Sequence, residues 1–301
     1  MSFFKVELQE FLEKRSIKYQ KDVSFLTLSY LKLGARAAFV VFPETDIQFS
    51  EILRFSSKKS LPTRVIGRMS NILPPEGDFD GVLVSTAKLD GIHVKEETVT
   101  ADAGVLLPTL AKALLPYGMS AFEELSGIPA SVGGAVYMNA GAYGREISDA
   151  LLSAKVYDIT KERVLVTDKS ELDFSYRKSR FFKRELYLLS ATFKCSFKPV
   201  QEMRAKIKEY AQKRRLTQPL SHPSLGSVFK KHGDKSAGYY IDTAGLKGFS
   251  IGDAEVSRVH ANFFINKGGA LRSDYFALIK EVKKRVYDFH GITLLEEIEY
   301  L

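Results

Sequence analysis

A segment rich in glycine and alanine, Gly127–Gly144, carries the clearest chemical signal in this sequence of 301 residues. It reads GIPASVGGAVYMNAGAYG, and a run with so few large side chains does not maximise apolar burial. Missing side chains let a backbone approach a ligand closely. We expect successive exposed N–H groups, and a helix that begins near Ser131, to bind a pyrophosphate. The alternative is a close helix–helix contact that requires small residues.

A second loop, Gly67–Asn71, follows an expected strand and reads GRMSN. It offers a tight turn, a hydroxyl and an amide. Strand–turn–helix junctions often use the same residue types, so this loop is a weak signal by itself. Neither loop has the P-loop pattern or the GxGxxG pattern, and therefore neither a P-loop nor a Rossmann site is indicated.

Three further segments place polar groups among apolar ones. An arginine lies between aromatic residues in Phe174–Phe182 (FSYRKSRFF), which suits recognition of a carboxylate or phosphate. A serine within Ser224–Phe229 (SLGSVF) could donate a proton, or could only cap a turn. Glu296 and Glu297 interrupt the apolar segment Ile292–Leu301. If that segment is a half-buried strand, one carboxylate points inward and needs a partner.

Metal and thiol chemistry are not indicated. The five histidines have no metal-ligand spacing, and Cys195, the single cysteine, lies in a strand pattern typical of a core. A chain without a possible internal disulfide suits a reducing compartment, and its N-terminus is too charged for a secretory signal. No apolar run approaches the roughly 20 residues of a membrane-spanning helix. We therefore expect a cytosolic protein without membrane contact.

The net charge of +8 comes from 44 basic and 36 acidic residues. The densest basic groups, Lys213–Arg215 and Lys283–Arg285, fall in amphipathic helical patterns, where they are typical of solvated helix faces. An anionic small-molecule substrate is the better explanation of the charge, and no nucleic-acid partner is expected.

Hydrophobic periodicity predicts a mixture of strands and helices without regular alternation, which favours the α+β class. Buried strands are expected at 37–42 and 64–67 around a helix that Thr45 or Asp46 caps, and Ser273 and Asp274 suit the cap of a helix that ends before Gly291. Further strands are expected at 81–86, 92–103, 154–195 and 261–266, and helices at 6–15, 105–118, 200–215 and 236–245.

Together these segments resemble one family, that of UDP-N-acetylenolpyruvoylglucosamine reductase (MurB). The resemblance is collinear from about Phe25 to the end of the chain. Its motifs are RVIGRMSNIL (64–73), GIPASVGGAVYMNAGAYGREISDA (127–150), SYRKSRF (175–181), PSLGSVFK (223–230), DTAGLKGFSIGDAEVSRVHANFFIN (242–266) and LLEEIEYL (294–301). Several matches in the same order are far more specific than any one of them.

The resemblance implies a two-subdomain FAD-binding module of the vanillyl-alcohol-oxidase (PCMH) type, followed by a C-terminal α+β substrate domain. We expect the FAD-binding subdomains at 1–75 and 76–198 and the substrate domain at 199–292. The final strand, 293–301, is expected to return to the first subdomain. The short segment after Arg177 indicates the subgroup that lacks an extra tyrosine-bearing loop.

The resemblance also implies the reaction. NADPH reduces FAD and leaves, and UDP-N-acetylglucosamine enolpyruvate then receives hydride at C3 to give UDP-N-acetylmuramate, a precursor of peptidoglycan. Arg177 would hold the substrate carboxylate and stabilise the developing charge. Ser227 would protonate C2 as a general acid. Glu297 would lie at the same end, at least partly protonated, because an ionised acid would oppose the new charge.

Binding residues follow from the matched motifs. The FAD contacts would come from both loops: Gly67, Arg68, Met69, Ser70, Asn71, Gly127, Ile128, Ser131, Gly133, Gly134, Asn139, Ala140 and Gly141. The substrate contacts would come from Tyr143, Tyr176, Arg214, Lys230 and His260, with Tyr239 or Tyr240 as alternatives to Tyr143.

Three positions depart from the family pattern. Met69 stands where glycine is usual, so we expect the first loop to follow a slightly different path. Ala35 replaces the second residue of a common Gly-Gly pair. Lys231-His232 replaces the usual Asn-Pro, which bears on a polar contact to the substrate.

Two other functions remain open on the sequence. An FAD-dependent oxidase of a sugar or an alcohol would share the cofactor module without needing Arg177, Ser227 and Glu297. A nucleotide-sugar binding protein derived from the family would have no activity. For the reductase we expect a monomer.

Overall fold

The computed structural model describes residues 3–301, which form two compact units. Unit 1 consists of the described residues up to 22 together with 38–68 and 80–210. Unit 2 consists of 23–37, 69–79 and 211–301. Each unit is therefore assembled from separate segments of the chain, and the expected three-domain division stays a prediction.

The first sheet of unit 1 has four strands in the order β1-β2-β5-β3, of which β3 and β5 run parallel. Helices α1 and α3 bury apolar side chains against it, among them Phe49 and Ile52 of α3. Thr45 caps α3 as predicted, because its hydroxyl accepts a hydrogen bond from the Gln48 N–H at 3.2 Å. The bounds are α1 Phe3–Lys14, β1 Lys18–Ser24, β2 Arg36–Phe42, α3 Asp46–Lys58, β3 Thr63–Ile66, β5 Phe79–Ser85 and the short 3-10 helix η1 Thr86–Lys88.

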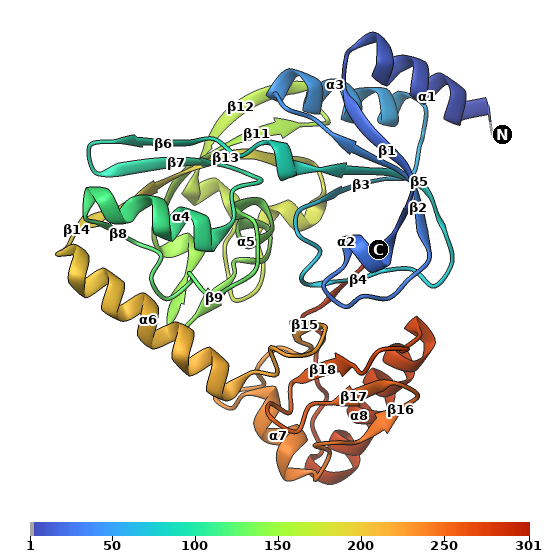
Figure 1. Ribbon diagram of the computed structural model, residues 1–301, viewed down its shortest axis with the longest axis vertical. Coiled ribbons are helices and arrows are strands. Elements are labelled where there is room, and N and C mark those ends of the chain that lie inside the picture. Colours follow the sequence, from blue (N-terminus) through green and yellow to red (C-terminus); the bar gives the residue numbers. More distant parts are fainter. Residues whose placement is uncertain (1–2) are drawn as a thin grey trace. The chain divides into compact units, whose positions relative to one another are not determined.

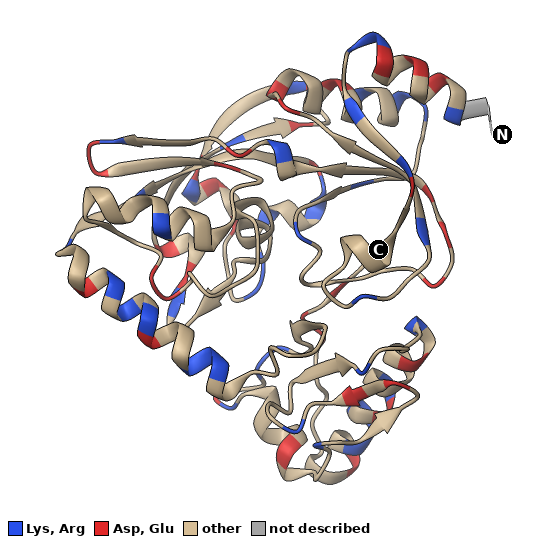
Figure 2. Cartoon of the chain, viewed as in Figure 1, with Lys and Arg blue, Asp and Glu red and all other residues tan. Residues whose placement is uncertain are grey.

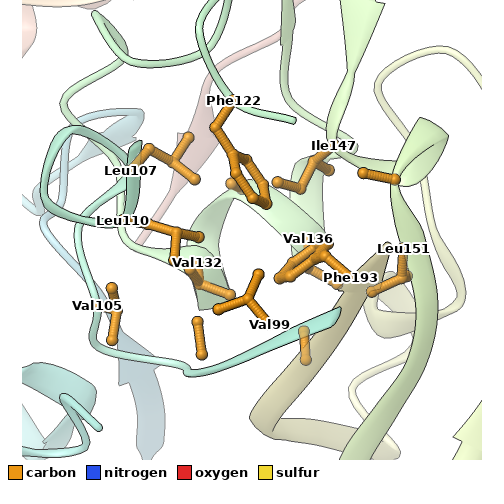
Figure 3. Packing of buried hydrophobic residues seen from close by; sticks show 14 of the residues in the cluster. Val99, Val105, Leu107, Leu110, Phe122, Val132, Val136, Ile147, Leu151 and Phe193 are labelled. Carbon is orange, nitrogen blue, oxygen red and sulfur yellow. The ribbon is translucent and has the colours of Figure 1, made fainter. Parts of the chain in front are cut away.

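The second sheet of unit 1 has five antiparallel strands in the order β12-β11-β13-β7-β6. Helices α4 and α5 lie on one face of this sheet (Figure 1) and share its buried core. Figure 3 shows that core, in which Phe122 and Phe193 meet edge to face with ring centroids 5.1 Å apart. The bounds are β6 Ile92–Lys95, β7 Thr98–Asp102, α4 Leu107–Leu114, η2 Leu115–Tyr117, α5 Val132–Met138, η3 Ile147–Asp149, β11 Leu151–Asp158, β12 Arg163–Asp168, η4 Lys169–Leu172, η5 Arg180–Lys183 and β13 Leu186–Lys194.

Two short strand pairs complete unit 1, and a long helix follows them. β8 (Met119–Ser120) pairs with β14 (Ser196–Phe197), and β9 (Gly141–Ala142) pairs with β10 (Arg145–Glu146). Helix α6 (Val200–Thr217) begins in unit 1 and ends in unit 2. Both units thus mix helices with parallel and antiparallel strands, and the expected α+β class is confirmed.

Unit 2 is built around a four-stranded antiparallel sheet in the order β15-β18-β17-β16. Helix α8 packs on it, and Leu31 and Leu73 from the early segments belong to the same core. The last strand, β19, pairs in parallel with β4. The bounds are α2 Phe25–Leu28, β4 Ile72–Leu73, β15 Ser224–Ser227, α7 Ala237–Thr243, β16 Ser250–Ile251, β17 Ala254–Val256, β18 Phe263–Asn266, α8 Arg272–His290 and β19 Glu299–Tyr300.

The strand expected over Ile292–Leu301 is wrong in extent. Only Glu299–Tyr300 is a strand, and a single bridge joins Glu296 to Phe229. The residues before β19 make isolated backbone hydrogen bonds instead of a regular ladder. Their apolar and polar side chains do not alternate, as a half-buried strand would require.

The helix expected from Ser273 is capped differently from the prediction. α8 begins at Arg272, and the Asp274 carboxylate accepts a hydrogen bond from the Leu271 N–H at 3.0 Å. Asp274 therefore contributes to the cap, whereas Ser273 lies in the first turn. At the other end Gly291 has a φ of 68°, the left-handed end that was expected.

The basic side chains do not gather on one element. Figure 2 shows Lys and Arg spread over both units, with a run along α6 and acidic residues in between. Within residues 3–301, none of the helices combines the length and apolar character that a membrane crossing requires. The absence of nucleic-acid and membrane partners stays a prediction.

Gly104→Ala is expected to destabilise unit 1, because Gly104 lies in the loop after β7 that contacts the start of α5. A Cβ there would lie 1.9 Å from Thr86 O and 2.7 Å from Leu89 O, which are backbone atoms. Overpacking costs about 1–3 kcal/mol, and we expect the upper part of that range. Urea unfolding followed by circular dichroism measures the effect. Gly77→Ala, whose Cβ meets nothing within 4 Å, is the control, and equal midpoints for both variants would contradict the expectation.

Candidate functional site

The two predicted cofactor loops meet in unit 1 at Gly67 and Ser131. A Cβ built on Gly67 would lie 2.3 Å from Ser131 Oγ, so a larger residue there would displace the Ser131 hydroxyl. Ser131 caps α5 as predicted, and its Oγ accepts a hydrogen bond from Gly134 N at 3.3 Å. Residues 127–130 next to it are half-buried and small or apolar. A backbone cradle of this kind fits a flat cofactor such as FAD, with Ser131 as a nearby polar group.

The start of α5 does not present the exposed N–H groups that the sequence suggested. Val132 N donates to Val105 O at 2.7 Å, and Gly133 N donates to Ala103 O at 2.8 Å. The expectation that successive N–H groups of this helix bind a pyrophosphate is therefore wrong for these two residues. Gly133 instead permits close packing, since a Cβ there would lie 3.0 Å from Ala103 O.

The far end of the glycine-rich stretch is a tight hairpin between β9 and β10. Its two turn residues, Tyr143 and Gly144, have φ values of 52° and 80°. Positive φ at both positions is typical of a type I′ turn, whose twist matches that of the flanking strands. The Tyr143 ring stacks on Tyr210 with centroids 4.4 Å apart, so one face of this candidate substrate residue is already covered.

Arg177 lies in the tight turn Ser175–Lys178 with a φ of 52°. Side chains other than glycine are uncommon in this conformation, and such outliers cluster at functional sites. Its side chain is only 15% exposed. Nη1 donates to Asn139 O at 3.1 Å and Nη2 to Gly141 O at 3.0 Å, while Glu146 Oε1 lies 3.4 Å from Nη1. These contacts fix the plane of the guanidinium.

The residues on either side of Arg177 also have defined places. The Arg177 guanidinium carbon lies 4.8 Å from the centroid of the Tyr176 ring, and Tyr176 is partly exposed. Ser179 Oγ donates to Tyr137 O at 2.6 Å, and Tyr137 stacks on Phe182 with centroids 4.4 Å apart. The segment is thus anchored on its far side to the end of α5.

A separate open depression of about 330 Å³ adjoins the same segment. It is lined mainly by polar and basic residues and does not include Arg177. Its lining consists of Asp173, Ser175, Lys178, Ser179, Arg180, Phe182 and Lys183, none of which the sequence singled out as a site residue.

In unit 2, Ser227 ends β15 at a β-bulge. The pairing with β18 shifts between Ser224–Ile265 and Ser227–Phe263, and Gly226 has a φ of 76°. A bulge changes the direction in which the following side chains point, and bulges are common beside active sites. Ser227 itself is half-buried.

Asn262, which sequence reasoning missed, holds the backbone that follows Ser227. Its buried amide donates to Phe229 O at 2.8 Å and accepts from Phe229 N at 3.0 Å. Its backbone oxygen accepts from Val228 N at 2.9 Å. The signal was present in the sequence as an asparagine inside the apolar strand ANFFIN, because a buried amide must find partners.

Glu297 is joined to the same backbone. Its N–H donates to Val228 O at 2.8 Å, and its carbonyl accepts from Asn71 Nδ2 at 3.1 Å. Unit 2 thus brings the backbone beside Ser227, the Glu297 position and the end of the first cofactor loop together. Arg177 belongs to unit 1, so the three candidate catalytic residues come from two units.

The carboxylate of Glu296 is bound by two neighbouring side chains, Lys283 and Tyr300. Lys283 Nζ lies 2.8 Å from its Oε1, and Tyr300 Oη donates to its Oε2 at 2.5 Å. Burial raises the pKa of Glu296, but the hydrogen bonds from Lys283 and Tyr300 outweigh it and hold this pKa below the ordinary 4.5. Of the two neighbouring acids, Glu296 is therefore an ionised structural group.

Met69 takes the backbone conformation that glycine favours. Its φ is 48°, and its side chain is 2% exposed. Tyr30 N donates to Met69 O at 3.4 Å, a contact within unit 2. The departure from glycine is therefore accommodated by a buried side chain on a left-handed backbone.

The remaining candidate substrate residues lie in unit 2. His260 is half-buried, and burial lowers its pKa below 6.5. Its Nδ1 accepts from Asn262 N at 3.2 Å, which assigns the proton of the neutral ring to Nε2. Lys230 N donates to Leu295 O at 2.8 Å, and Arg214 lies near the end of α6.

Cys195 is buried in the core as predicted, and burial raises the pKa of its thiol to about 11. A thiol with so little thiolate is a poor nucleophile.

Across residues 3–301, no group of three or more His, Cys, Asp and Glu is arranged to hold a metal ion. The absence of a metal stays a prediction.

Two family models match most of the chain. The model of the C-terminal domain of UDP-N-acetylenolpyruvoylglucosamine reductase matches residues 218–301, and an FAD binding domain matches residues 37–168. The reductase of Caldicellulosiruptor saccharolyticus is 38% identical over 292 residues, which are 96% of this chain and 94% of that protein. A Streptococcus pneumoniae reductase is 37% identical over 98% of this chain and 97% of its own length.

Solved structures agree with the sequence relatives. The reductase MurB from Thermus caldophilus superposes with a TM-score of 0.80 at 30% identity, over 94% of this chain and 98% of that one. A BBE-like protein of Physcomitrella patens gives a TM-score of 0.51 at 18% identity over 63% of this chain and 44% of its own, a likeness of fold alone. The expected fold, a PCMH-type FAD-binding module with a C-terminal domain, is confirmed.

Asn262→Ala is expected to lower the stability of unit 2. The change leaves the N–H and the carbonyl of Phe229 without their buried partner, and each orphaned group costs about 1–3 kcal/mol. Urea unfolding measures the loss. Gln212→Ala on the exposed side of α6 is the control. An unchanged midpoint for Asn262→Ala would show that the hydrogen bonds of the Asn262 amide to Phe229 contribute nothing to stability.

Lys283→Met should weaken the pH dependence of stability. The pKa of Glu296 is below 4.5 in the folded chain, so its contribution is present above the unfolded pKa and is lost as pH falls through the folded pKa. A partly exposed ion pair contributes about 0.5–1 kcal/mol. Unfolding midpoints at pH 7 and pH 3.5 should differ less in Lys283→Met than in the parent. Lys280→Met on the same helix should behave as the parent does, and an equal pH dependence in all three proteins would refute the assignment.

Proposed function

Because the chain belongs to the UDP-N-acetylenolpyruvoylglucosamine reductase family, whose members are FAD-binding oxidoreductases, we propose that it uses NADPH to reduce UDP-N-acetylglucosamine enolpyruvate to UDP-N-acetylmuramate. The product is a precursor of peptidoglycan, so the protein would act in the cytoplasm of a cell that builds a wall. Both substrates are anionic, which agrees with the net charge of +8.

Bound FAD supplies a hydride carrier between NADPH and C3 of the enolpyruvyl group. The residues that would hold it lie in two loops that meet at Gly67 and Ser131. Small side chains dominate the second loop, as close approach to a flat ring requires. The proposed contacts are those of Gly67 to Asn71, Gly127, Ile128, Ser131, Gly133, Gly134, Asn139, Ala140 and Gly141.

The orientation of Arg177 supports the proposal most directly. When hydride arrives at C3, negative charge develops at C2 and spreads into the substrate carboxylate. A guanidinium already held by Asn139 O and Gly141 O needs little reorganisation to stabilise that charge. Its planar shape also suits bidentate binding of a carboxylate. We assign Arg177 this electrostatic role.

Ser227 is assigned the proton transfer to C2. Its hydroxyl proton passes to the carbanion-like carbon, and the serine oxygen regains a proton from solvent. A hydroxyl is a weak acid, but the carbon centre is a strong base, so the transfer is favourable. The β-bulge, together with the two hydrogen bonds from the Asn262 amide to the Phe229 backbone, supports a fixed backbone at Ser227 for this role.

Glu297 is assigned to the same end of the substrate, in a form that is at least partly protonated. Its backbone connects Val228, the residue after Ser227, with Asn71 of the first loop. A neutral carboxyl would not oppose the charge that Arg177 stabilises. Tyr143, Tyr176, Arg214, Lys230 and His260 are the proposed contacts to the UDP-sugar.

Ser227→Ala should separate the two half-reactions. Anaerobic reduction of bound FAD by NADPH should stay within about twofold of the parent, because it needs no proton from Ser227. Reoxidation by the enolpyruvyl substrate should slow by about 10²–10⁴-fold, the range of general acid catalysis. Stopped-flow absorbance of the flavin measures both rates.

Ser224→Ala, on the same strand before the bulge, is the matched control and should retain both rates. If Ser227→Ala slowed both half-reactions equally, the proton-donor role of Ser227 would be wrong. Fast reoxidation of the parent by air, without the enolpyruvyl substrate, would instead favour an oxidase. A protein that never takes up FAD would contradict both enzymes and favour a binding protein.

A further inference from the structure

Glu146 is a charged residue beside Arg177 to which the reaction gives no role. It ends β10 and is the N-cap residue of the 3-10 helix η3, and its backbone N–H donates to Asp149 Oδ2 at 2.9 Å. Its side chain is 32% exposed, and that of Arg177 is 15% exposed. A carboxylate in this position has a fixed backbone and limited contact with water.

The two oxygens of Glu146 have different partners. Oε1 lies 3.4 Å from Arg177 Nη1, and Oε2 accepts a hydrogen bond from Asn139 Nδ2 at 2.8 Å. One carboxylate therefore spans the guanidinium and the amide. An ionised carboxylate is suited to this task, because both of its oxygens are acceptors.

Asn139 transmits this contact to three segments. Its side chain is buried, and Nδ2 also donates to Ser175 O at 3.0 Å, at the start of the Arg177 turn. Its Oδ1 accepts from Ser148 N at 3.3 Å, and its own carbonyl accepts from Arg177. The end of α5, the Arg177 turn and η3 are thus joined through one amide that Glu146 orients.

Gly141 also contacts the guanidinium of Arg177. Its carbonyl accepts from Arg177 Nη2, and a Cβ at this position would lie 2.8 Å from Arg145 O and 3.1 Å from Arg177 Nη1. Any larger residue would therefore press on the guanidinium or on the hairpin. This part of the glycine-rich stretch contacts the arginine directly.

We propose that Glu146 is a positioning residue for Arg177, whose carboxylate fixes the guanidinium and the Asn139 amide at the same time. The inference rests on the proposed role of Arg177 toward the substrate carboxylate. Glu146 does not touch the substrate in this account. It acts by keeping the arginine in the orientation that the developing charge requires.

Glu146→Gln tests the proposal with almost no change of shape. Glutamine has one acceptor and one NH₂ group, so it must place a donor against either Arg177 or Asn139. A catalytic group displaced by about 1 Å loses up to about 10²-fold in rate, and we expect reoxidation by the enolpyruvyl substrate to slow about 10–100-fold. NADPH-driven reduction of FAD should stay within about twofold of the parent rate.

Binding provides a readout that is independent of turnover. Because Glu146→Gln removes a negative charge but keeps Arg177, the Kd of UDP-N-acetylmuramate, measured by calorimetry, should change by less than about threefold. A rate loss without an affinity loss is the mark of misorientation. A merely structural role would instead lower the unfolding midpoint and the FAD content and slow both half-reactions together, which would overturn the proposal. Glu162→Gln, which breaks an exposed 3.3 Å ion pair with Arg54 in the same unit, is the matched control and should match the parent.

Arg177→Lys separates this proposal from the proposed function. If Glu146 acts only through Arg177, then Glu146→Gln combined with Arg177→Lys should be no slower than Arg177→Lys alone. Multiplied losses in the double variant would contradict the positioning role. If Arg177→Lys reoxidises at the parent rate, the assignment of Arg177 itself fails. If Arg177→Lys is slow and Glu146→Gln is not, only the positioning role fails.

Discussion

The seven-residue helix α5 and its fixed ends determine most of the site in unit 1. A helix of this length is not stable by itself, because few residues follow its nucleation. The structure fixes its start through hydrogen bonds to Ala103 O and Val105 O, and its end through the Asn139 amide. The first end of α5 therefore places Ser131 against Gly67 of the first cofactor loop. The other end places the Asn139 carbonyl where it accepts a hydrogen bond from Arg177.

Glycines serve three different purposes in the two cofactor loops. Gly67 allows contact with Ser131, Gly133 allows packing on Ala103, and Gly141 leaves room for the Arg177 guanidinium. Composition alone could not separate these purposes, since each requires the absence of a side chain. Residues 127–130 are half-buried and have none of these three packing purposes.

The two units position their reactive groups by the same physical means. In unit 1, backbone carbonyls and a carboxylate hold a guanidinium, and in unit 2 a buried amide holds the backbone of Phe229, two residues after Ser227. Both arrangements give buried polar groups hydrogen-bond partners, which makes them stiff. A reactive group on a stiff support loses little free energy to reorganisation during the reaction.

The sequence by itself determined the class of fold, most of the helices and strands, and the segments that carry the site, because periodicity, caps and ordered motifs are local properties. It also identified Arg177, Ser227 and Glu297 as candidates, whose catalytic roles stay proposals. It did not determine that the α5 N–H groups are occupied, that the last segment is strand only at Glu299–Tyr300, or that Glu146 and Asn262 hold the reactive segments. Those facts depend on hydrogen bonds between residues that are 27 or more positions apart. A linear pattern does not show which distant acceptor a donor meets. Tertiary structure alone decided them.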